Sequence, residues 1–336
     1  MALTEPVTPT QQTTLTSTQQ QLLRLLADGT FHSGTALGTA LGVSRTAVWK
    51  ALDGIAALGI DLERAPRLGY RVAGGIDLHD GERIRAALGT QARALLAELQ
   101  VLTVTESTNE AAKGFAPVSG QGACCLAEYQ TGGRGRLGRT WASPFARNLY
   151  CSLAWDFDDG IAALEGLSLA VGVAVRRALA GLGAGDIGLK WPNDLLRDGR
   201  KLGGILVEVA GDPEGRCRAV IGIGINVAMP AAAARTIHQP WSDLADLPIS
   251  RNALAAAVLT ELLPLLRDFP THGFRAHRAE WEANDHYRDR PVSIRAGNHL
   301  HEGIARGVND HGALALECTD GLLWFSGGEV SLRGAQ

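Results

Sequence analysis

The stretch Thr131-Gly-Gly-Arg-Gly-Arg-Leu-Gly-Arg-Thr-Trp141 decides between two folds. Its glycines at 133, 135 and 138 satisfy the spacing G-x-G-x-x-G, and a predicted strand over 122–129 comes before them. A dinucleotide-binding fold needs a helix to open at the last glycine, so that the helix N-terminus holds the pyrophosphate. Arg139-Thr-Trp-Ala-Ser-Pro144 follows instead, with no apolar helical period and an early proline. The stretch therefore argues against a Rossmann fold.

The same stretch predicts a flexible loop that closes over an anion. Its glycines let the backbone come close to a ligand, at an entropic cost in the free protein. Arg134, Arg136 and Arg139 offer planar forks of donors that match carboxylate and phosphate groups. This combination favours phosphate or acyl-phosphate chemistry. A solvated basic loop is the alternative when the segment is taken by itself.

Length and composition limit the classes of protein that remain. A chain of 336 residues suggests two or three domains, and its net charge of −3 excludes a protein that binds polyanions over its whole surface. No apolar run approaches the ~18 residues of a membrane span. The five cysteines are odd in number and contain no C-x-x-C pair. That pattern argues against a disulfide framework or a zinc site and favours the reduced cytoplasm.

The N-terminal quarter of the chain has the order of a winged helix-turn-helix. Residues 1–18 are rich in Thr and Gln, have no apolar core like that of a signal peptide, and indicate a disordered tail. Over residues 19–75, leucines give a first helix, Ser33 caps a second and Ser44 caps a third, Arg45–Leu58. Two short strands around a Pro/Gly turn follow in Ile60–Val72 and resemble a wing.

If this domain reads DNA, its third helix lies in the major groove and its wing contacts phosphate. The residues that would face DNA are Arg45, Thr46, Trp49, Lys50, Arg64, Arg67 and Arg71. Basic residues exceed acidic ones by only two between Ser44 and Gly75, so a lone copy should bind operator DNA weakly and a dimer is expected. A winged helix that serves only as a protein-contact module is the alternative.

The remainder predicts an α/β domain over 77–285 and a small β domain over 288–336. In the first, strands outnumber helices, which favours a large mixed sheet backed by a few helices. Helices are expected at Ile84–Leu99, Ala163–Leu182 and Arg251–Phe269, the last disturbed by Pro264. Strands are expected at Val101–Thr105, Ala123–Tyr129, Asn148–Trp155, Ile187–Trp191, Gly203–Val209 and Ala219–Val227. Short strands between turn signals in the last region fit an SH3-like barrel, which makes the whole chain α+β and multidomain.

Four further segments carry polar groups at predicted strand ends. Glu106-Ser-Thr-Asn109 follows a strand and either binds a small polar ring or caps the next helix. Lys190-Trp-Pro-Asn-Asp194 ends in a turn whose Asp194 is either a Mg²⁺ ligand or an ordinary turn aspartate. Lys201-Leu-Gly-Gly-Ile205 puts a compact positive charge where backbone can approach a ligand. Ile221-Gly-Ile-Gly-Ile-Asn226 is an apolar strand with two positions that lack side chains.

The order of these segments resembles that of the biotin protein ligases, which carry a GRGRxGRxW loop, a KWPND turn, a KxxGI segment and a GxGxN strand. The resemblance runs from about Gln19 to the C-terminus, and the winged helix makes it similar to the class that combines ligase and biotin operon repressor. It implies two reactions: biotin and MgATP give biotinoyl-adenylate and pyrophosphate, and a lysine of the biotin carboxyl carrier protein of acetyl-CoA carboxylase then takes the acyl group and releases AMP.

The resemblance also assigns residues, motif by motif. Lys201, Arg134 and Arg136 would be catalytic, with Lys201 stabilising charge through both steps. Asp194 would serve Mg²⁺. The biotin-binding set would be Ser107, Thr108, Asn109, Gln130, Gly133, Arg134, Arg136, Lys201, Gly204 and Gly222, with Ser107, Thr108 and Gln130 at the ureido end. The ATP-binding set would be Arg136, Asn226, Trp241 and Arg333.

One position departs from the family pattern. Leu137 stands where many members carry another basic residue, so activity should survive while retention of the adenylate is open. Ordering of the loop by adenylate would favour a homodimer that presents two winged helices to an operator, and the carrier protein would compete for the same surface. A ligand-sensing repressor without ligase activity and a lipoate-type ligase are the remaining alternatives.

Overall fold

The computed structural model describes residues 15–116, 118–297, 299–326 and 330–334, the last of these by their backbone alone. These residues divide into two compact units. One runs to Ile76 and includes Thr103–Thr105, and the other holds the remaining residues from Asp77 onward. Among the described residues, no helix is both long and apolar enough to cross a membrane.

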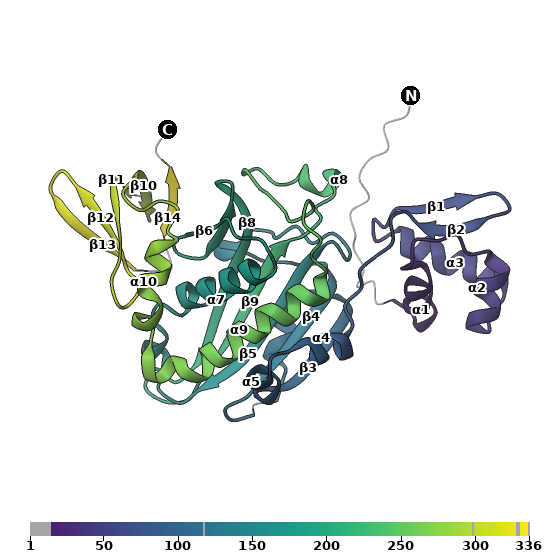
Figure 1. Cartoon of the computed structure of the whole chain (residues 1–336), viewed down its shortest axis with the longest axis horizontal. Coiled ribbons are helices and arrows are strands. Elements are labelled where there is room, and N and C mark those ends of the chain that lie inside the picture. The colour runs from purple at the N-terminus through teal and green to yellow at the C-terminus, as the bar shows by residue number, and fades with distance from the viewer. Residues whose placement is uncertain (1–14, 117, 298, 327–329, 335–336) are drawn as a thin grey trace. The chain divides into compact units, whose positions relative to one another are not determined.

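The first unit is a winged helix-turn-helix, as the sequence predicted (Figure 1). Its helices are α1 (Ser17–Leu26), α2 (Gly34–Leu41) and α3 (Arg45–Ala56), and its wing is the antiparallel pair β1 (Leu62–Ala65) and β2 (Gly69–Val72). The side chains of Thr16, Ser33 and Ser44 cap the three helices. Helix α1 therefore begins at Ser17, inside the stretch that the sequence assigned to a tail, and residues 1–14 lie outside the described part.

A seven-stranded sheet forms the centre of the second unit, in the order β3-β4-β5-β9-β8-β7-β6 (Figure 1). In this order, every pair of neighbouring strands from β4 to β6 is antiparallel. The strands are β3 (Leu96–Thr105), β4 (Gly122–Gln130), β5 (Asn148–Phe157), β6 (Ile187–Lys190), β7 (Asp194–Arg197), β8 (Arg200–Gly211) and β9 (Cys217–Asn226).

Two long helices, α7 (Leu167–Gly181) and α9 (Arg251–His272), pack side by side on one face of this sheet (Figure 1). Their buried leucines, valines and alanines form one continuous apolar core with the inward-facing residues of β5, β8 and β9. Shorter helices are α4 (Gly81–Ala87), α5 (Thr90–Leu95), α6 (Thr108–Lys113), α8 (Ala231–Ala234) and α10 (Arg275–Ala283). The large sheet backed by few helices agrees with the expectation from the sequence.

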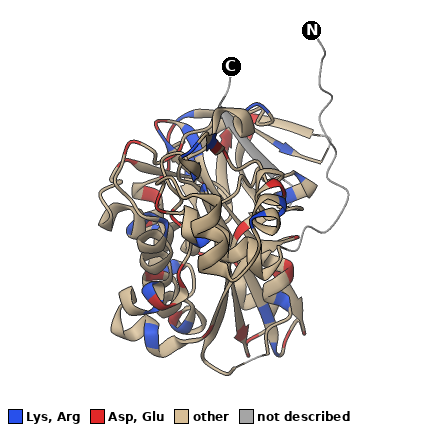
Figure 2. Ribbon diagram, turned by 90° about the vertical axis from the view of Figure 1, so that its right-hand side faces the viewer, with Lys and Arg blue, Asp and Glu red and all other residues tan. Residues whose placement is uncertain are grey.

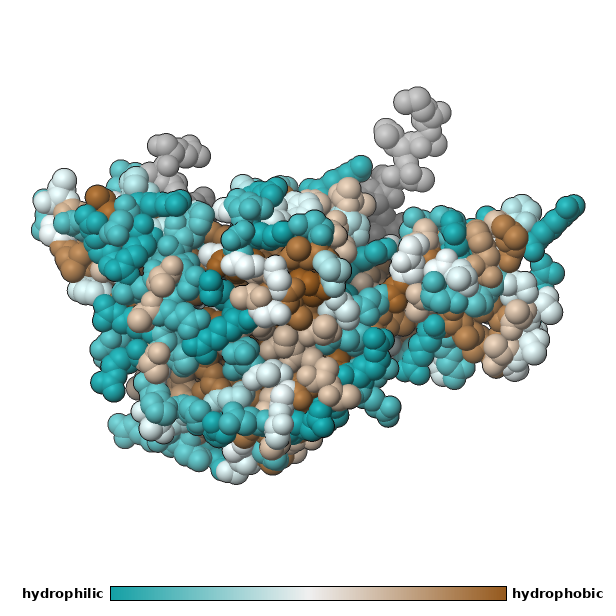
Figure 3. Space-filling view, viewed as in Figure 1, coloured by the Kyte–Doolittle hydropathy of each residue, from teal (hydrophilic) through white to brown (hydrophobic). Residues whose placement is uncertain are grey.

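The C-terminal residues form a five-stranded antiparallel sheet in the order β13-β12-β11-β10-β14. Its strands are β10 (Pro291–Ala296), β11 (His299–Val308), β12 (Leu314–Cys318), β13 (Gly321–Phe325) and β14 (Val330–Gly334). The indole of buried Trp191 donates a hydrogen bond to the carbonyl of Gly312 at 2.9 Å and so ties this sheet to the central one. On the edge strand β13, Leu322, Leu323 and Trp324 are exposed, and apolar side chains are visible over this sheet in Figure 3.

Several predicted elements were wrong in detail. The single helix expected at Ile84–Leu99 is two short helices followed by the first residues of β3, because Leu88 is extended and Gly89 is the N-cap of α5. The helix expected at Ala163–Leu182 is divided at Gly166, whose φ of +74° is the left-handed value that glycine tolerates. Helix α9 runs through Pro264 without a break, since buried leucines hold it on both sides of the missing N–H.

Candidate functional site

One part of the site is a small cluster of buried polar side chains, called the polar cluster below. Ser107 and Thr108 lie where β3 ends and α6 begins, and Gln130 is the last residue of β4. The side chain of Gln130 accepts hydrogen bonds from the backbone N–H and the hydroxyl of Thr108, at 2.9 and 3.1 Å. Ser107 occupies the N-cap position of α6, as the helix-cap interpretation predicted, but its side chain makes no capping hydrogen bond.

Ser152 on β5 completes this polar cluster. Its buried hydroxyl lies 2.7 Å from the hydroxyl of Thr108 and 2.6 Å from the side-chain oxygen of Asn109. Gly222 on the neighbouring strand β9 leaves room for the Asn109 amide, because a Cβ at Gly222 would lie 2.3 Å from the Asn109 oxygen. The result is a buried set of hydroxyls and amides, of the kind that binds a small polar ring by hydrogen bonds.

A second part of the site gathers the charged residues of two other motifs. The Lys201 ammonium lies 2.7 Å from the Asp194 carboxylate, and both side chains are mostly buried. Arg136 donates a hydrogen bond to the side-chain oxygen of Asn193 at 3.1 Å. Burial lowers the pKa of the Arg136 guanidinium from its ordinary value, and the charge of Asp194 opposes this shift. The glycine-rich loop, the turn after β6 and the strand β8 thus bring Arg136, Asp194 and Lys201 to one place.

Trp141, the last residue of the Arg-rich stretch, covers this charged group. The Lys201 ammonium lies 5.7 Å from the centre of the Trp141 ring, within the range of a cation–π contact. Gly204 and Gly224 accommodate this ring, since a Cβ at Gly224 would lie 2.6 Å from it and a Cβ at Gly204 would lie 3.5 Å from it.

A pocket opens beside Lys201. The loop that contains Trp241 pairs with Lys201 through the backbone, and the side chain of buried Asn226 donates to the carbonyl of Ser242 at 3.0 Å. The pocket is lined by Thr140, Trp141, Ala142, Lys201, Asn226, Met229, Ile237, Gln239 and Trp241. Two aromatic rings and apolar side chains next to a lysine suit a flat heterocycle that carries phosphate.

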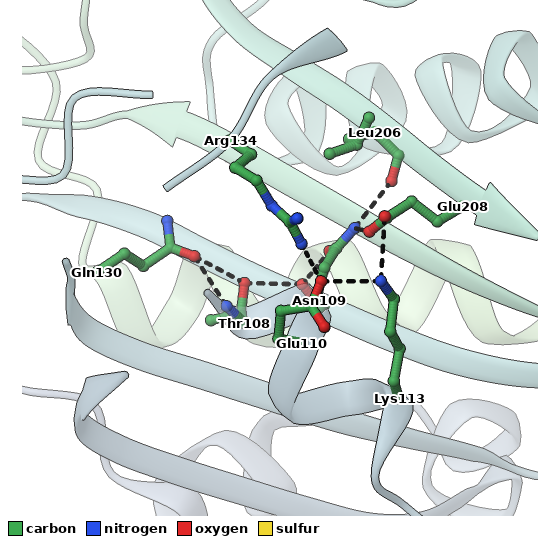
Figure 4. Close-up of polar contacts among 9 residues, drawn as sticks. Thr108, Asn109, Glu110, Lys113, Gln130, Arg134, Leu206 and Glu208 are labelled. Carbon is green, nitrogen blue, oxygen red and sulfur yellow. Dashed lines mark hydrogen bonds and ion pairs between the residues drawn. The ribbon is translucent and has the colours of Figure 1, made fainter. Parts of the chain in front are cut away.

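Arg134 lies in a group of charged side chains at the start of the loop (Figure 4). It pairs with Glu110 on α6, which also accepts a hydrogen bond from Lys113 at 2.8 Å. Lys113 pairs in turn with Glu208 of β8 at 3.1 Å, and Glu208 accepts from the side chain of Asn109 at 2.7 Å. Hydrogen bonds and ion pairs therefore connect Arg134 to the polar cluster without a break.

The residues expected to face DNA lie on the first unit. Arg45, Thr46, Trp49 and Lys50 are all exposed on α3, and their i, i+4 spacing puts them along one side of the helix. Of the wing arginines, Arg64 pairs with Asp53 and Arg71 with Glu63, at 2.5 and 2.6 Å. Arg67 lies exposed in the turn between the wing strands. Acidic and basic residues are interspersed along the chain in Figure 2, in line with its small net charge.

Sequence reasoning left several of these residues unassigned. Trp141 was part of the quoted stretch, but only the structure places its ring over Lys201. Ser152 had a signal in hindsight, since it is a polar residue within an apolar strand. The sequence contained no signal for the charged residues Glu110, Lys113 and Glu208, because exposed charges on a helix and a strand are common. Arg333 lies on β14, whose backbone pairs with β10, and its side chain is outside the described residues.

Three models of protein families match this chain. The biotin/lipoate A/B protein ligase family matches residues 101–226, a helix-turn-helix domain matches 18–71, and the biotin protein ligase C-terminal domain matches 289–333. The chain is 41% identical to the bifunctional ligase/repressor BirA of Salmonella typhimurium, over 94% of this chain and 97% of that protein. It is 40% identical to its Escherichia coli counterpart, over the same shares of the two chains.

Shorter relatives match the chain less completely. The biotin–[acetyl-CoA-carboxylase] ligase of Paracoccus denitrificans is 34% identical and matches over its whole length, which covers 70% of this chain. Among solved structures, the biotin protein ligase of Aquifex aeolicus in complex with biotin and ATP is similar with a TM-score of 0.61 and 27% identity, over 71% of this chain and all of that one. The chain thus matches relatives with two activities over nearly its full length.

Proposed function

This chain belongs to the biotin protein ligase family, and from that premise we propose that it attaches biotin to a carrier protein and represses transcription. The observation that carries the ligase half is the pair of sites: a buried cluster of hydroxyls and amides at Ser152, Thr108 and Asn109, and the charged group of Lys201, Asp194 and Arg136. The first suits the ureido ring of biotin and the second suits its carboxylate together with the phosphates of ATP.

In the first reaction a carboxylate oxygen of biotin attacks the α-phosphorus of ATP. The bond from that phosphorus to the bridging oxygen breaks, and pyrophosphate leaves with the electron pair. Arg134 and Arg136 hold the carboxylate and the α-phosphate together, which makes the encounter effectively intramolecular. The Lys201 ammonium leaves its ion pair with Asp194 and stabilises the negative charge that builds up on the phosphate oxygens. Asn226 and Trp241 hold the adenosine side in the pocket that Trp141 also lines.

In the second reaction the amine of a carrier lysine attacks the acyl carbon of biotinoyl-adenylate. An amide bond forms, the amine loses a proton to water, and AMP leaves with the electrons of the acyl–oxygen bond. Lys201 stabilises the negative charge on the carbonyl oxygen during this attack. Gly222 and Gly204 leave the space that Asn109 and Trp141 occupy beside the intermediate. A Cβ at Gly133 would lie 2.7 Å from the Ser143 hydroxyl, so the loop backbone has room there only because the residue is glycine.

We propose that Mg²⁺ enters with ATP. Asp194 fits this role, because Mg²⁺ in nucleotide sites takes one or two carboxylates and completes its shell with phosphates and water. No group of three or more His, Cys, Asp and Glu side chains suited to a metal occurs among the described residues. The ion would neutralise charge on the phosphates, while Lys201 and the arginines position them.

The repressor half rests on the first unit. The exposed Arg45, Thr46, Trp49 and Lys50 would read operator DNA in the major groove, with Arg64 and Arg67 on phosphate. We propose that adenylate orders the Arg-rich loop and favours a homodimer, which the biotin carboxyl carrier protein opposes by using the same surface. The cytoplasm, where the carrier protein and DNA are both accessible, is the proposed location.

The test is biotin-dependent exchange of labelled pyrophosphate into ATP, with lipoate run in parallel. Exchange with biotin alone, followed by transfer to a carrier domain, supports the proposal. Exchange with lipoate instead would move the chain to the lipoate branch of its family, and no exchange with either would leave a repressor without ligase activity. Operator binding with and without biotin and ATP then tests the second half.

A further inference from the structure

Glu110 is an acidic residue beside an arginine that must bind an anion. It lies on α6 directly after Asn109, whose side chain belongs to the polar cluster, and it pairs with Arg134 at the start of the glycine-rich loop (Figure 4). The position of Glu110 requires an explanation. Its carboxylate pairs with the arginine that is proposed to bind the carboxylate of biotin, so it would repel the substrate and compete with it for Arg134.

The contacts of Glu110 indicate orientation rather than blockage. Only the Nη2 atom of Arg134 donates to Glu110 in the hydrogen bond formed by this pair. Arginine presents five N–H donors in a rigid plane, so a contact through one nitrogen fixes that plane and leaves donors for a ligand. A fixed plane reduces the ordering entropy that a free arginine loses when it binds.

The neighbours of Glu110 fix its own position and its charge. Lys113 donates to the same carboxylate oxygen at 2.8 Å and pairs with Glu208 at 3.1 Å. The hydrogen bond from Lys113, and then the one from Arg134, hold the pKa of Glu110 below its ordinary value. The carboxylate therefore stays ionised at neutral pH. The two acids and two bases of this group balance, and the charge of nearby Glu106 also acts on Arg134.

We propose that Glu110 is a positioning residue that holds Arg134 ready for the carboxylate of the substrate, with Lys113 and Glu208 as its support. The inference rests on the proposed function, because it assumes that Arg134 binds the carboxylate. It assigns a role in ground-state binding: the arginine is ordered before the substrate arrives, and the chemical step is left unchanged.

The test compares Glu110→Gln with Glu98→Gln in the pyrophosphate exchange assay. Glu98 is an exposed acid on β3, so the control removes the same charge from the same unit. The expected result for Glu110→Gln is a KM for biotin about two- to fivefold higher with unchanged kcat, since exposed ion pairs have effects of that size. The difference in KM between Glu110→Gln and wild type should shrink at 1 M salt, because screening weakens the Glu110–Arg134 pair of the wild-type protein. A purely structural role would show no such salt dependence.

A second variant tests the support. Lys113→Met should raise the KM for biotin by itself, and adding it to Glu110→Gln should raise it little further, because both changes act through Arg134. A KM for Glu110→Gln that equals the Glu98→Gln value, or falls below wild type, would overturn the inference and make Glu110 a mere neighbour or a competitor of the substrate. If the wild-type protein catalyses no exchange, the proposed function fails and this inference fails with it. If the wild type catalyses exchange and only the KM comparison fails, the inference alone is wrong, so the two failures are distinguishable.

Discussion

At the scale of single residues, Gly222 sets the space available to Asn109. A Cβ at this position would lie 2.3 Å from the Asn109 oxygen, and both residues are held in buried structure. Gly222→Ala should therefore displace Asn109 and raise the KM for biotin by about tenfold or more, because a shift of 1 Å in a positioning group is costly. The measurement is the pyrophosphate exchange rate against biotin concentration.

Gly181→Ala is the matched control for this change. Gly181 ends α7 and has no atom within 4 Å of the position of a new Cβ. It should leave the KM unchanged and raise the melting temperature slightly, since alanine has a higher helix propensity. Equal KM values for the two variants would mean that Asn109 can move without loss, and its assignment to biotin binding would be wrong.

His79 predicts a pH dependence of stability. It is buried with no hydrogen-bond partner for either ring nitrogen among the described residues, and burial, followed by the charge of Arg251, holds its pKa well below the ordinary value. The unfolded chain takes up a proton near pH 6.5 while the folded chain does not. The stability from this group is thus present above pH 6.5 and is lost as the pH falls below it, by up to about 1.4 kcal/mol per pH unit.

The measurement is urea unfolding of wild type and His79→Leu between pH 7.5 and 5. The leucine variant should lose less stability on acidification, and it sacrifices no side-chain hydrogen bond. Asp285 acts in the opposite sense, because burial raises its pKa to about 6, so the difference between the two proteins carries the information rather than either slope alone. Parallel curves would show that His79 titrates in the folded state at its ordinary pKa.

At the scale of elements, the start of α9 holds the segment that opens the second unit. Arg251 is buried, pairs with buried Glu128 of β4 at 2.7 Å, and donates to the carbonyl of Asp77. Asn252 donates to the carbonyl of Leu78 at 2.8 Å. Arg251→Met would leave the Glu128 charge buried without its partner, and removal of one partner of a buried pair destabilises by about 3–5 kcal/mol.

Chemical denaturation checks this value. Arg267→Met is the control, since Arg267 lies on the same helix and pairs at the surface with its neighbour Asp268. It should leave the free energy of unfolding close to that of wild type, because exposed pairs contribute little. If the two variants lose equal stability, the buried pair does not hold the start of the second unit.

The same scale shows how far the sequence carries. Periodicity and caps found α1–α3, α9 and most strands because each has an apolar face of the right period. The prediction of one helix at Ile84–Leu99 was wrong. The apolar residues continue from two short helices into β3 without a change of period that would mark the boundaries. Strand β7 and helix α10 were not predicted. For the site, motifs named Lys201, Asp194 and Thr108, but Ser152 and Glu110 enter only through pairings between strands and helices far apart in sequence.

At the scale of the whole molecule, the two units divide the proposed activities. All described residues assigned to biotin and ATP lie after Asp77, and all those assigned to DNA lie before Ile76. A ligand stabilises the folded unit that binds it, by about 2.7 kcal/mol when present at 100 times its Kd. Biotin with MgATP should therefore raise the melting transition of the second unit and leave that of the first unit in place.

Differential scanning calorimetry of the full chain, at a concentration too low for dimers, measures this directly. A short duplex that contains the operator gives the reciprocal control, because it should raise only the transition of the first unit. If each ligand raises a separate transition, the single chain transmits nothing from one unit to the other. Any coupling between biotin and DNA binding would then arise from the association of two chains. One transition that rises with either ligand would instead show that the units unfold together, and adenylate could then act on DNA binding within one chain.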